Sequence, residues 1–416
     1  MVFMIAQRQI SFSPPDITQV EIDEVVDTLN SGWITTGPKT KRLESELAAF
    51  VGTNKVACLS SATSALECAL RLLDVGPGDE VVTSAYTYTA SASCICHVGA
   101  TPVLVDVAEG SFEMDYDRLE HAITEKTKAV IPIDVGGRMV DYDSLRTALD
   151  AARSKWRPRT QAQERFDRVP VLADAAHSLG ARRHGENSGQ AAELTAFSFH
   201  AVKNLTTAEG GALTWLPDAL DDESSYKQIM LMSLHGQTKD ALAKDKAGAW
   251  EYDIAFPGWK CNMTDIQASL GLGQLARYPG ILERRHEIVR RYADGLADAG
   301  VSLMRHSQGN PDVDGFASSA HLMLARLDGK SRAFRDELIE RLALAGVATN
   351  VHYKPLPLLS AYRNLGFDPA DFPHAMAQFE NEITLPLHTL LSNEDVDYIV
   401  EQFCLLKRKM EQEGLE

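Results

Sequence analysis

The chain is organised around the stretch LTAFSFHAVKNLTTAEGG, residues 194–211, which contains the lysine on which the functional prediction depends. Its apolar start at 194–199 predicts a buried strand, and its small-residue end, closed by two glycines, predicts a loop. Ligands of open α/β sheets bind beyond the carboxyl ends of the strands, which is where Lys203 lies. A lysine desolvated there has a lowered pKa and becomes a nucleophile that can form a Schiff base. For this segment alone, a surface lysine in an ordinary turn is an equal alternative.

Helix and strand patterns alternate along the first two thirds of the chain. Apolar spacing predicts helices at 16–29, 40–50, 65–73, 89–98, 115–123 and 145–153, and strands at 55–59, 80–83, 102–107, 129–134, 169–173 and 212–215. Strands that alternate with helices at this spacing form right-handed βαβ units and a parallel sheet. The sequence therefore predicts an α/β fold, with a large domain over residues 1–275 that includes an N-terminal arm.

The chain changes character near residue 277. A helix is expected at 266–275, and a second, long and charged helix at 282–299 is suited to bridging two domains. Strands at 321–326 and 347–352 and helices at 332–345 and 396–410 then predict a smaller C-terminal α/β domain over residues 276–416. The charged stretch 154–168 is expected to be a solvated insertion loop and not a binding patch.

Composition excludes several classes of protein. The 416 residues carry a net charge of -17, which argues against a broad nucleic-acid surface, and their 44% hydrophobic content argues against disorder and fibres. The N-terminus lacks the features of a signal peptide, and no apolar run reaches bilayer length, so a cytoplasmic protein is expected. The 6 cysteines are scattered in a way that fits neither a disulfide framework nor a zinc site, and we predict no metal.

A run of small hydroxyl residues, 60–64, precedes the helix predicted at 65–73. Free backbone amides and the helix dipole make such a loop a site for an anion, for example a phosphate. Plain N-capping is the alternative, because Ser and Thr are preferred there anyway. Tyr88 follows the next strand, where an aromatic ring can stack on a flat cofactor.

Asp174 ends the apolar strand predicted at 169–173. A carboxylate at the end of a buried strand is costly unless it meets a cation or a donor, and a protonated ring nitrogen is such a partner. Capping of the following turn is the alternative. A Schiff-base lysine, a phosphate-binding helix start, an aromatic stacking face and an acid for a ring nitrogen together form the set that pyridoxal phosphate (PLP) needs.

Ten motifs, in this order along nearly the whole chain, carry a resemblance to a known family. They are SGWITTGP, SSATSAL, GPGDEVVT, GATPVLVDV, TKAVIP, DAAHSLGA, FSFHAVKNLTTAEGG, LHG, KCNMTDIQASLGLGQL and VHYKPLP. In these motifs the chain resembles the DegT/DnrJ/StrS sugar aminotransferases, members of the aspartate-aminotransferase fold (fold type I). The resemblance implies a large PLP-binding domain with a mainly parallel sheet and a smaller C-terminal domain.

The resemblance implies a role for each cofactor-binding residue. Lys203 would form the Schiff base and shuttle protons between substrate and cofactor, while Asp174 would pair with the pyridinium nitrogen. His177 would reach the phenolic oxygen and Tyr88 would stack on the ring. The phosphate would be bound by Ala62, Thr63 and Ser198. Asn262, with Lys260 near it, would reach the phosphate of a second subunit, which implies a homodimer with shared active sites.

The resemblance also implies a substrate class. The family mostly aminates keto sugars carried on a nucleoside diphosphate, with glutamate as donor and pyridoxamine phosphate (PMP) as the intermediate form of the cofactor. Thr35, Lys260, His321, His352 and Tyr353 would line the sugar and diphosphate path. A satisfied core histidine is the alternative for His321, and a packing aromatic for Tyr353. Amination at C4 of a 4-keto sugar is the nearest match.

Three rival interpretations remain. A sugar 3-dehydratase of this fold replaces the Schiff-base lysine with histidine, and Lys203 speaks against it. A regulator that binds PLP without turnover is disfavoured by the acidic charge and by the absence of a DNA-binding motif in the sequence. An aminotransferase for a cyclitol ketone is compatible with the sequence.

Overall fold

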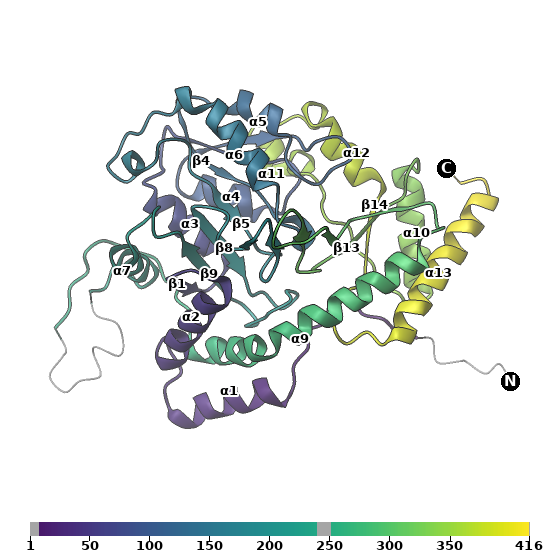
Figure 1. Ribbon diagram of the computed structural model, residues 1–416, viewed down its shortest axis with the longest axis horizontal. Coiled ribbons are helices and arrows are strands. Elements are labelled where there is room, and N and C mark those ends of the chain that lie inside the picture. Colours follow the sequence, from purple (N-terminus) through teal and green to yellow (C-terminus); the bar gives the residue numbers. More distant parts are fainter. Residues whose placement is uncertain (1–7, 239–250, 416) are drawn as a thin grey trace.

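A computed structural model describes residues 8–238 and 251–415 (Figure 1), so residues 1–7 of the predicted N-terminal arm lie outside the described part. The helices are α1 (Gln19–Ser31), α2 (Pro38–Val51), α3 (Ala62–Leu72), α4 (Ala90–His97), α5 (Tyr116–Ala122), α6 (Tyr142–Ala151), α7 (Asp222–Ser233), α9 (Asp265–Gly295), α10 (Arg332–Leu344), α11 (Ser360–Asn364), α12 (Pro373–Asn381) and α13 (Asn393–Gln412). The strands are β1 (Val56–Leu59), β2 (Glu80–Ser84), β3 (Thr101–Val105), β4 (Thr127–Ile131), β5 (Leu172–Asp174), β6 (Arg182–Arg183), β7 (Glu186–Asn187), β8 (Leu194–Ser198), β9 (Gly211–Trp215), β10 (Ser302–Leu303), β11 (Ser307–Gln308), β12 (Phe316–Ala317), β13 (Met323–Arg326) and β14 (Glu382–Leu385).

The central sheet of the large lobe is mainly parallel, as the sequence predicts. Hydrogen bonding gives the strand orders β1-β9-β8-β5 and β3-β2-β4, and the parallel bridges Val130–Val171 and Ile133–Asp174 join β4 to β5. Only β9 runs against the others, because its pairings with β1 and β8 are antiparallel while β5–β8, β2–β3 and β2–β4 are parallel. This agrees with the mainly parallel sheet that the resemblance implies, and β9 is antiparallel because the loop after β8 returns the chain directly beside it.

Local sequence signals set the helix ends. Thr18 and Glu21 form a capping box at the start of α1, with the Thr18 backbone N–H donating to the Glu21 carboxylate at 2.6 Å. Gly32 ends α1 in a left-handed conformation with φ of 74°, which glycine adopts without strain. Helix α3 begins at Ala62, three residues before the predicted start, because the hydroxyl of Ser61 caps it and accepts the N–H of Ser64 at 3.0 Å.

Helix α9 is continuous through the predicted division between two helices. It passes Pro279 and Gly280 without ending, and its Thr264–Gln267 capping box fixes its start. Its first half packs into the large-lobe core through Leu272 and Tyr278, and its second half packs into the small-lobe core through Ile288 and Tyr292. In Figure 1 it runs from beneath α2 to the side of α13, so it belongs to both lobes.

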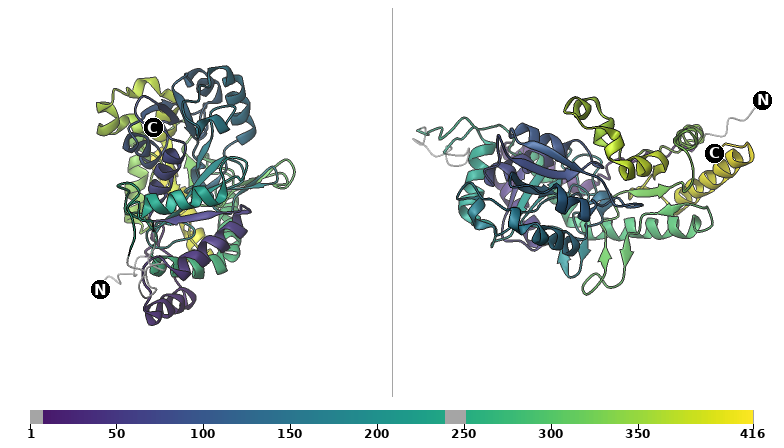
Figure 2. Two further views of the ribbon diagram at one scale, coloured as in Figure 1. Left: turned by 90° about the vertical axis from the view of Figure 1, so that its left-hand side faces the viewer. Right: turned by 90° about the horizontal axis from the view of Figure 1, so that it is seen from above.

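The small lobe is built on the antiparallel sheet β10-β13-β14, covered by α10 and α13. The strand predicted at 347–352 is not formed, and only single bridges at Val347 and Asn350 mark it. The lobes lie side by side along the longest axis (Figure 2). Within the described ranges, no helix combines the length and the apolar character needed to cross a bilayer.

The stretch 154–168 is only partly the solvated loop that its charges predict. Trp156 is 7% exposed and Gln163 is 0% exposed, and the Gln163 amide donates to the carbonyl of Leu73 at 3.1 Å. The buried Lys128 ammonium lies 5.4 Å from the centre of the Trp156 ring. These few anchors fix the segment against the large-lobe core, although most of its residues are polar.

Candidate active site

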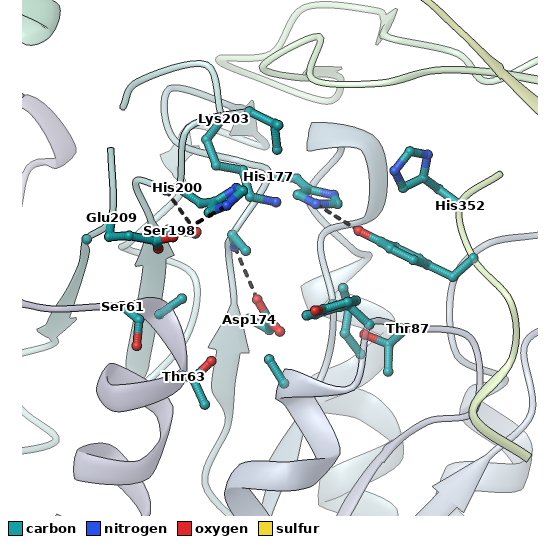
Figure 3. A pocket seen from close by; sticks show the side chains of 18 residues that line it. Ser61, Thr63, Thr87, Asp174, His177, Ser198, His200, Lys203, Glu209 and His352 are labelled. Carbon is teal, nitrogen blue, oxygen red and sulfur yellow. Dashed lines mark hydrogen bonds and ion pairs between the residues drawn. The ribbon is translucent and has the colours of Figure 1, made fainter. Parts of the chain in front are cut away.

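The predicted cofactor residues meet in one cavity of about 500 Å³. It opens at the carboxyl ends of β5 and β8, where α/β sheets bind ligands (Figure 3). Its lining includes every cofactor residue that we assigned to this subunit, namely Ala62, Thr63, Tyr88, Asp174, His177, Ser198 and Lys203. His352 and Tyr353 enter it from the small lobe.

The start of α3 forms an anion cradle at one end of the cavity. The first backbone N–H groups of a helix have no acceptor within the helix, and the helix dipole adds a positive field there. Ser61 and Thr63 line the cavity at this point, and Ser198 lies opposite at the end of β8. A phosphate fits this set of donors.

Gly211 allows β9 to pass directly behind the cradle. A methyl group at this position would lie 2.3 Å from the Ser61 carbonyl carbon and 2.4 Å from the Ala62 nitrogen, and neither backbone atom can move without displacing the start of α3. The glycine is therefore needed for close approach and not for a positive φ.

We expect Gly211→Ala to lower the free energy of unfolding by about 1–3 kcal/mol, the usual range for overpacking, and to weaken cofactor binding. Thermal unfolding and a cofactor titration measure both effects. Gly280→Ala is the control, because the described residues place no atom within 4 Å of its added methyl group. A Gly211→Ala enzyme with unchanged cofactor affinity would show that the cradle does not bind the phosphate.

Asp174 is a buried carboxyl group at the floor of the cavity, 6% exposed. The hydroxyl of Ser91 donates to Oδ2 at 2.7 Å and the backbone N–H of Ala176 donates to Oδ1 at 3.2 Å. Burial raises the pKa of Asp174, while Ser91, Ala176 and the nearby Lys203 oppose that rise. A protonated ring nitrogen at this floor would supply the charge partner that the buried carboxylate requires.

Lys203 projects into the cavity from the turn after β8. Burial lowers the pKa of its ammonium group to about 8, and Asp174 acts in the opposite direction. At this pKa about a tenth of the Lys203 side chains carry a neutral amine at pH 7, far more than at the ordinary lysine pKa, and the neutral amine is the form that attacks a carbonyl.

Capture of PLP by the cofactor-free enzyme should therefore depend on pH. The rate is expected to rise as the pH increases through about 8, where Lys203 loses its proton, and to level off above it. Stopped-flow absorbance in the visible range measures this rate. A rate that continues to rise toward the ordinary lysine pKa of about 10.4 would contradict the lowered pKa.

His177 is held in one tautomer. The backbone N–H of Gly136 donates to Nδ1 at 3.2 Å, so Nδ1 is an acceptor and the proton of the neutral ring lies on Nε2. Nε2 lies 2.9 Å from the Tyr353 hydroxyl. Burial, Lys203 and His352 lower the pKa of His177 well below its ordinary value, so the ring is neutral. His177 therefore presents an N–H donor, which suits a phenolate oxygen.

The remaining predicted residues lie elsewhere. His321 is 4% exposed behind His177, with its ring centre 4.3 Å from that of His177 and its Nδ1 2.9 Å from the amide oxygen of Asn204. His321 is thus a buried histidine with a hydrogen-bond partner, which is the alternative to substrate binding that the sequence analysis gave. Thr35 and Asn262 line a second cavity of about 240 Å³, and Lys260 contacts Asn262.

Sequence reasoning missed several residues of the site. Ser91 donates to Asp174 across 83 positions of sequence, and nothing in the segment ASASCICH indicates this contact. Thr87 and Ala176 line the cavity beside predicted residues, and His200 faces Glu209 across its rim at 3.6 Å. The only sequence signal for Thr87 and Ala176 is that each directly precedes a predicted cofactor residue, Tyr88 and His177 respectively.

The mainly parallel sheet, the lysine and aspartate at its carboxyl edge and the cradle at α3 are the arrangement of a PLP-dependent enzyme of fold type I, and the side chains that line the cavity are of the kinds that PLP requires. The chain belongs to the DegT/DnrJ/EryC1/StrS aminotransferase family, whose pattern matches residues 15–404. This confirms the resemblance seen in the sequence.

Individual relatives agree with this assignment. Over 406 residues the chain is 37% identical to the spore coat polysaccharide biosynthesis protein SpsC of Bacillus subtilis, covering 96% of this chain and 97% of SpsC. The putative sugar aminotransferase Spr1654 from Streptococcus pneumoniae, in its PMP-form, superimposes with a TM-score of 0.92 at 56% identity, covering 96% of this chain and 100% of that one. A PLP-form of the same protein also matches, with a TM-score of 0.92 at 54% identity. The Helicobacter pylori aminotransferase PseC, involved in the biosynthesis of pseudoaminic acid, matches with a TM-score of 0.81 at 26% identity, covering 97% of this chain and 100% of PseC.

Proposed function

We propose that this enzyme transfers an amino group from glutamate to a nucleotide-linked 4-keto sugar. The observation that carries the proposal is the presence of Lys203, Asp174 and the α3 cradle around one cavity that is closed on its far side by His352 and Tyr353. Polysaccharide biosynthesis is the proposed context, supported by the similarity to SpsC, a spore coat polysaccharide biosynthesis protein, and to PseC, which takes part in the biosynthesis of pseudoaminic acid.

Bound PLP would supply a ring that withdraws electrons from the substrate carbon. Asp174 would hold the proton on the ring nitrogen, and the N–H of His177 would bind the phenolic oxygen. Ser198, Thr63 and the α3 amides would bind the phosphate. Lys203 would hold the cofactor between turnovers and, at Nζ, take up and return the proton that leaves the donor carbon.

Substrate recognition is proposed for the small-lobe side of the cavity. Tyr353 offers a hydroxyl that now bonds His177, and its ring lies 6.4 Å from that of Tyr88, which is 63% exposed. Two rings of this kind, with hydroxyl and imidazole groups beside them, suit the apolar faces and hydroxyl edges of a sugar.

The test is the absorption spectrum of the purified enzyme with PLP, followed by glutamate and then by a panel of keto substrates. We expect the visible band to disappear with glutamate and to return with a nucleotide-linked 4-keto sugar. Return with a 3-keto sugar or with a cyclitol ketone would replace the proposed substrate. A band that does not respond to glutamate would contradict the proposed donor.

We also propose that the enzyme is a homodimer. The outer face of α1 exposes Val20, Ile22, Val26 and Leu29, by 45–54% each, an apolar surface that association would cover. The Asn262 side-chain amide bonds the Thr36 hydroxyl at 2.6 Å, outside the cavity of its own chain, which suits a role in the site of a partner.

Mixing two inactive variants tests this shared site. Lys203→Ala and Asn262→Ala chains, unfolded and refolded together, should regain activity, because one site of the mixed dimer contains both native side chains. A mixture of Lys203→Ala with Lys203→Arg is the control and should stay inactive. Sedimentation as a monomer would contradict the proposal.

All six cysteines are free thiols, which supports the proposed cytoplasmic location.

A further inference from the structure

Thr384 and Phe12 fix the orientation of the His352 ring. Its Nδ1 lies 2.9 Å from the hydroxyl oxygen of Thr384 on β14, and the ring of Phe12 stacks on it with 5.7 Å between centres. The ring lines the cavity, and within the described residues no protein group hydrogen-bonds its Nε2. Nε2 is therefore the nitrogen that a ligand meets.

Behind Thr384 lies a carboxyl group to which the proposed chemistry has given no role. Glu382 is 0% exposed, its Oε1 accepts the hydroxyl of Thr384 at 2.5 Å, and its Oε2 accepts the backbone N–H of His352 at 2.8 Å. Burial raises the pKa of Glu382 to about 8, although Thr384, the His352 N–H and Arg335 oppose that rise. This carboxyl group changes its protonation within the pH range of ordinary enzymes.

Two proton arrangements fit these heavy atoms. In the first, Nδ1–H of His352 donates to Thr384, whose hydroxyl donates to ionised Glu382, and Nε2 presents a lone pair. In the second, protonated Glu382 donates to Thr384, whose hydroxyl donates to Nδ1, and Nε2 carries the proton. The arrangements differ by one proton and by the tautomer of His352, and neither contains a charged imidazole ring.

Burial favours storage of that proton on Glu382 and not on the imidazole ring of His352. Burial and the charge of Lys203 lower the pKa of His352 to about 3, so an imidazolium is disfavoured. On the other side, the Arg335 guanidinium acts to lower the pKa of Glu382 and donates to the carbonyls of Phe379 and Glu382 at 2.8 and 3.0 Å. The hydroxyl of Tyr86 donates to the His352 carbonyl at 2.6 Å, and the centre of the Tyr353 ring lies 5.0 Å from that of the His352 ring.

We propose that Glu382, Thr384 and His352 form a proton relay that takes up the proton that the amino donor loses on entering the site. This rests on the proposed aminotransferase function, because a donor amine arrives as an ammonium group and attacks only as a neutral amine. His352 Nε2 accepts that proton, the Nδ1 proton passes to the Thr384 oxygen, and the Thr384 hydroxyl proton passes to Oε1 of Glu382. The reverse transfers release that proton again, so the relay has no net gain or loss of protons over a catalytic cycle. His352 touches the ligand, while Thr384 and Glu382 are positioning residues.

The first test measures the histidine tautomer directly, independently of turnover. In enzyme with ¹⁵N-labelled imidazole groups, assigned with a His352→Gln variant, His352 should stay neutral and change from Nε2–H to Nδ1–H as the pH rises through about 8. Thr384→Val should abolish this change, whereas Thr384→Ser keeps the hydroxyl and should retain it. Thr349→Val is the matched control, since Thr349 also has a buried hydroxyl but one without a hydrogen-bond partner in the described residues.

The second test measures the reaction with glutamate in single turnover. Thr384→Val should slow it by about 10-fold or more and remove the pH dependence near 8, while Thr384→Ser restores both. A wild-type pH profile and tautomer change in Thr384→Val would overturn the relay. A normal tautomer change in an enzyme that never reacts with glutamate would uphold the relay and contradict the proposed function.

Discussion

Lys203→Ala is expected to abolish transamination, with a loss of about 10³-fold or more, because it removes both the covalent attachment of the cofactor and the proton carrier. The variant should still bind PLP through Asp174, His177 and the α3 cradle, since those groups are unchanged. Absorption of the dialysed variant, with single-turnover rates from glutamate, measures both effects.

Lys126→Ala is the control for this substitution. It removes an exposed lysine of the large lobe that does not line the cavity, so the spectrum and the rate should stay unchanged. Near-full turnover in Lys203→Ala would overturn the mechanism. Loss of all cofactor binding would instead show that the noncovalent contacts are weaker than their geometry indicates.

Asp174→Asn is expected to weaken cofactor binding and to slow both half-reactions. It removes the charge partner of a buried ring nitrogen, and the loss of one partner in such a pair costs about 2–5 kcal/mol, or roughly 30-fold or more in affinity. The hydroxyl of Ser91 and the N–H of Ala176 would then face an amide that can accept only one of them well. Equilibrium dialysis with PLP measures the affinity.

Asp134→Asn offers a matched control. Asp134 is also buried at the end of a central strand, and it accepts the hydroxyl of Ser178 at 2.6 Å and the N–H of Val140 at 3.0 Å, but it does not line the cavity. This variant should lose stability while keeping its affinity for PLP. Equal affinity losses in the two variants would show that Asp174 acts through the fold and not through the ring nitrogen.

The sequence predicts much of the large lobe because its signals are local. The apolar run before Asp174 and the one before Lys203 become adjacent parallel strands, β5 and β8, which brings the two side chains to one edge. Ser61 caps α3 and so creates the cradle that the hydroxyl run predicts. Such features depend on neighbouring residues and on a general rule for α/β sheets.

Features that depend on distant partners were not predictable in this way. The reversed direction of β9, the contact of Ser91 with Asp174 and the position of Glu382 behind His352 all arise from segments far apart in the chain. The continuous helix α9 also contradicts a local signal, because Pro279 and Gly280 ordinarily end helices. There, packing against both cores outweighs the loss of one backbone hydrogen bond.

Helix α9 has a consequence for how the molecule can come apart. Arg285, in its middle, is 4% exposed and donates to the carbonyls of Ala320, His321 and Leu387, each at 2.8 Å. Removal of either lobe would leave one half of this helix with an uncovered apolar side, and removal of the small lobe would also take away all three acceptors of the buried Arg285 guanidinium. Neither lobe is therefore a candidate for separate expression, and heating should melt both lobes in a single cooperative transition.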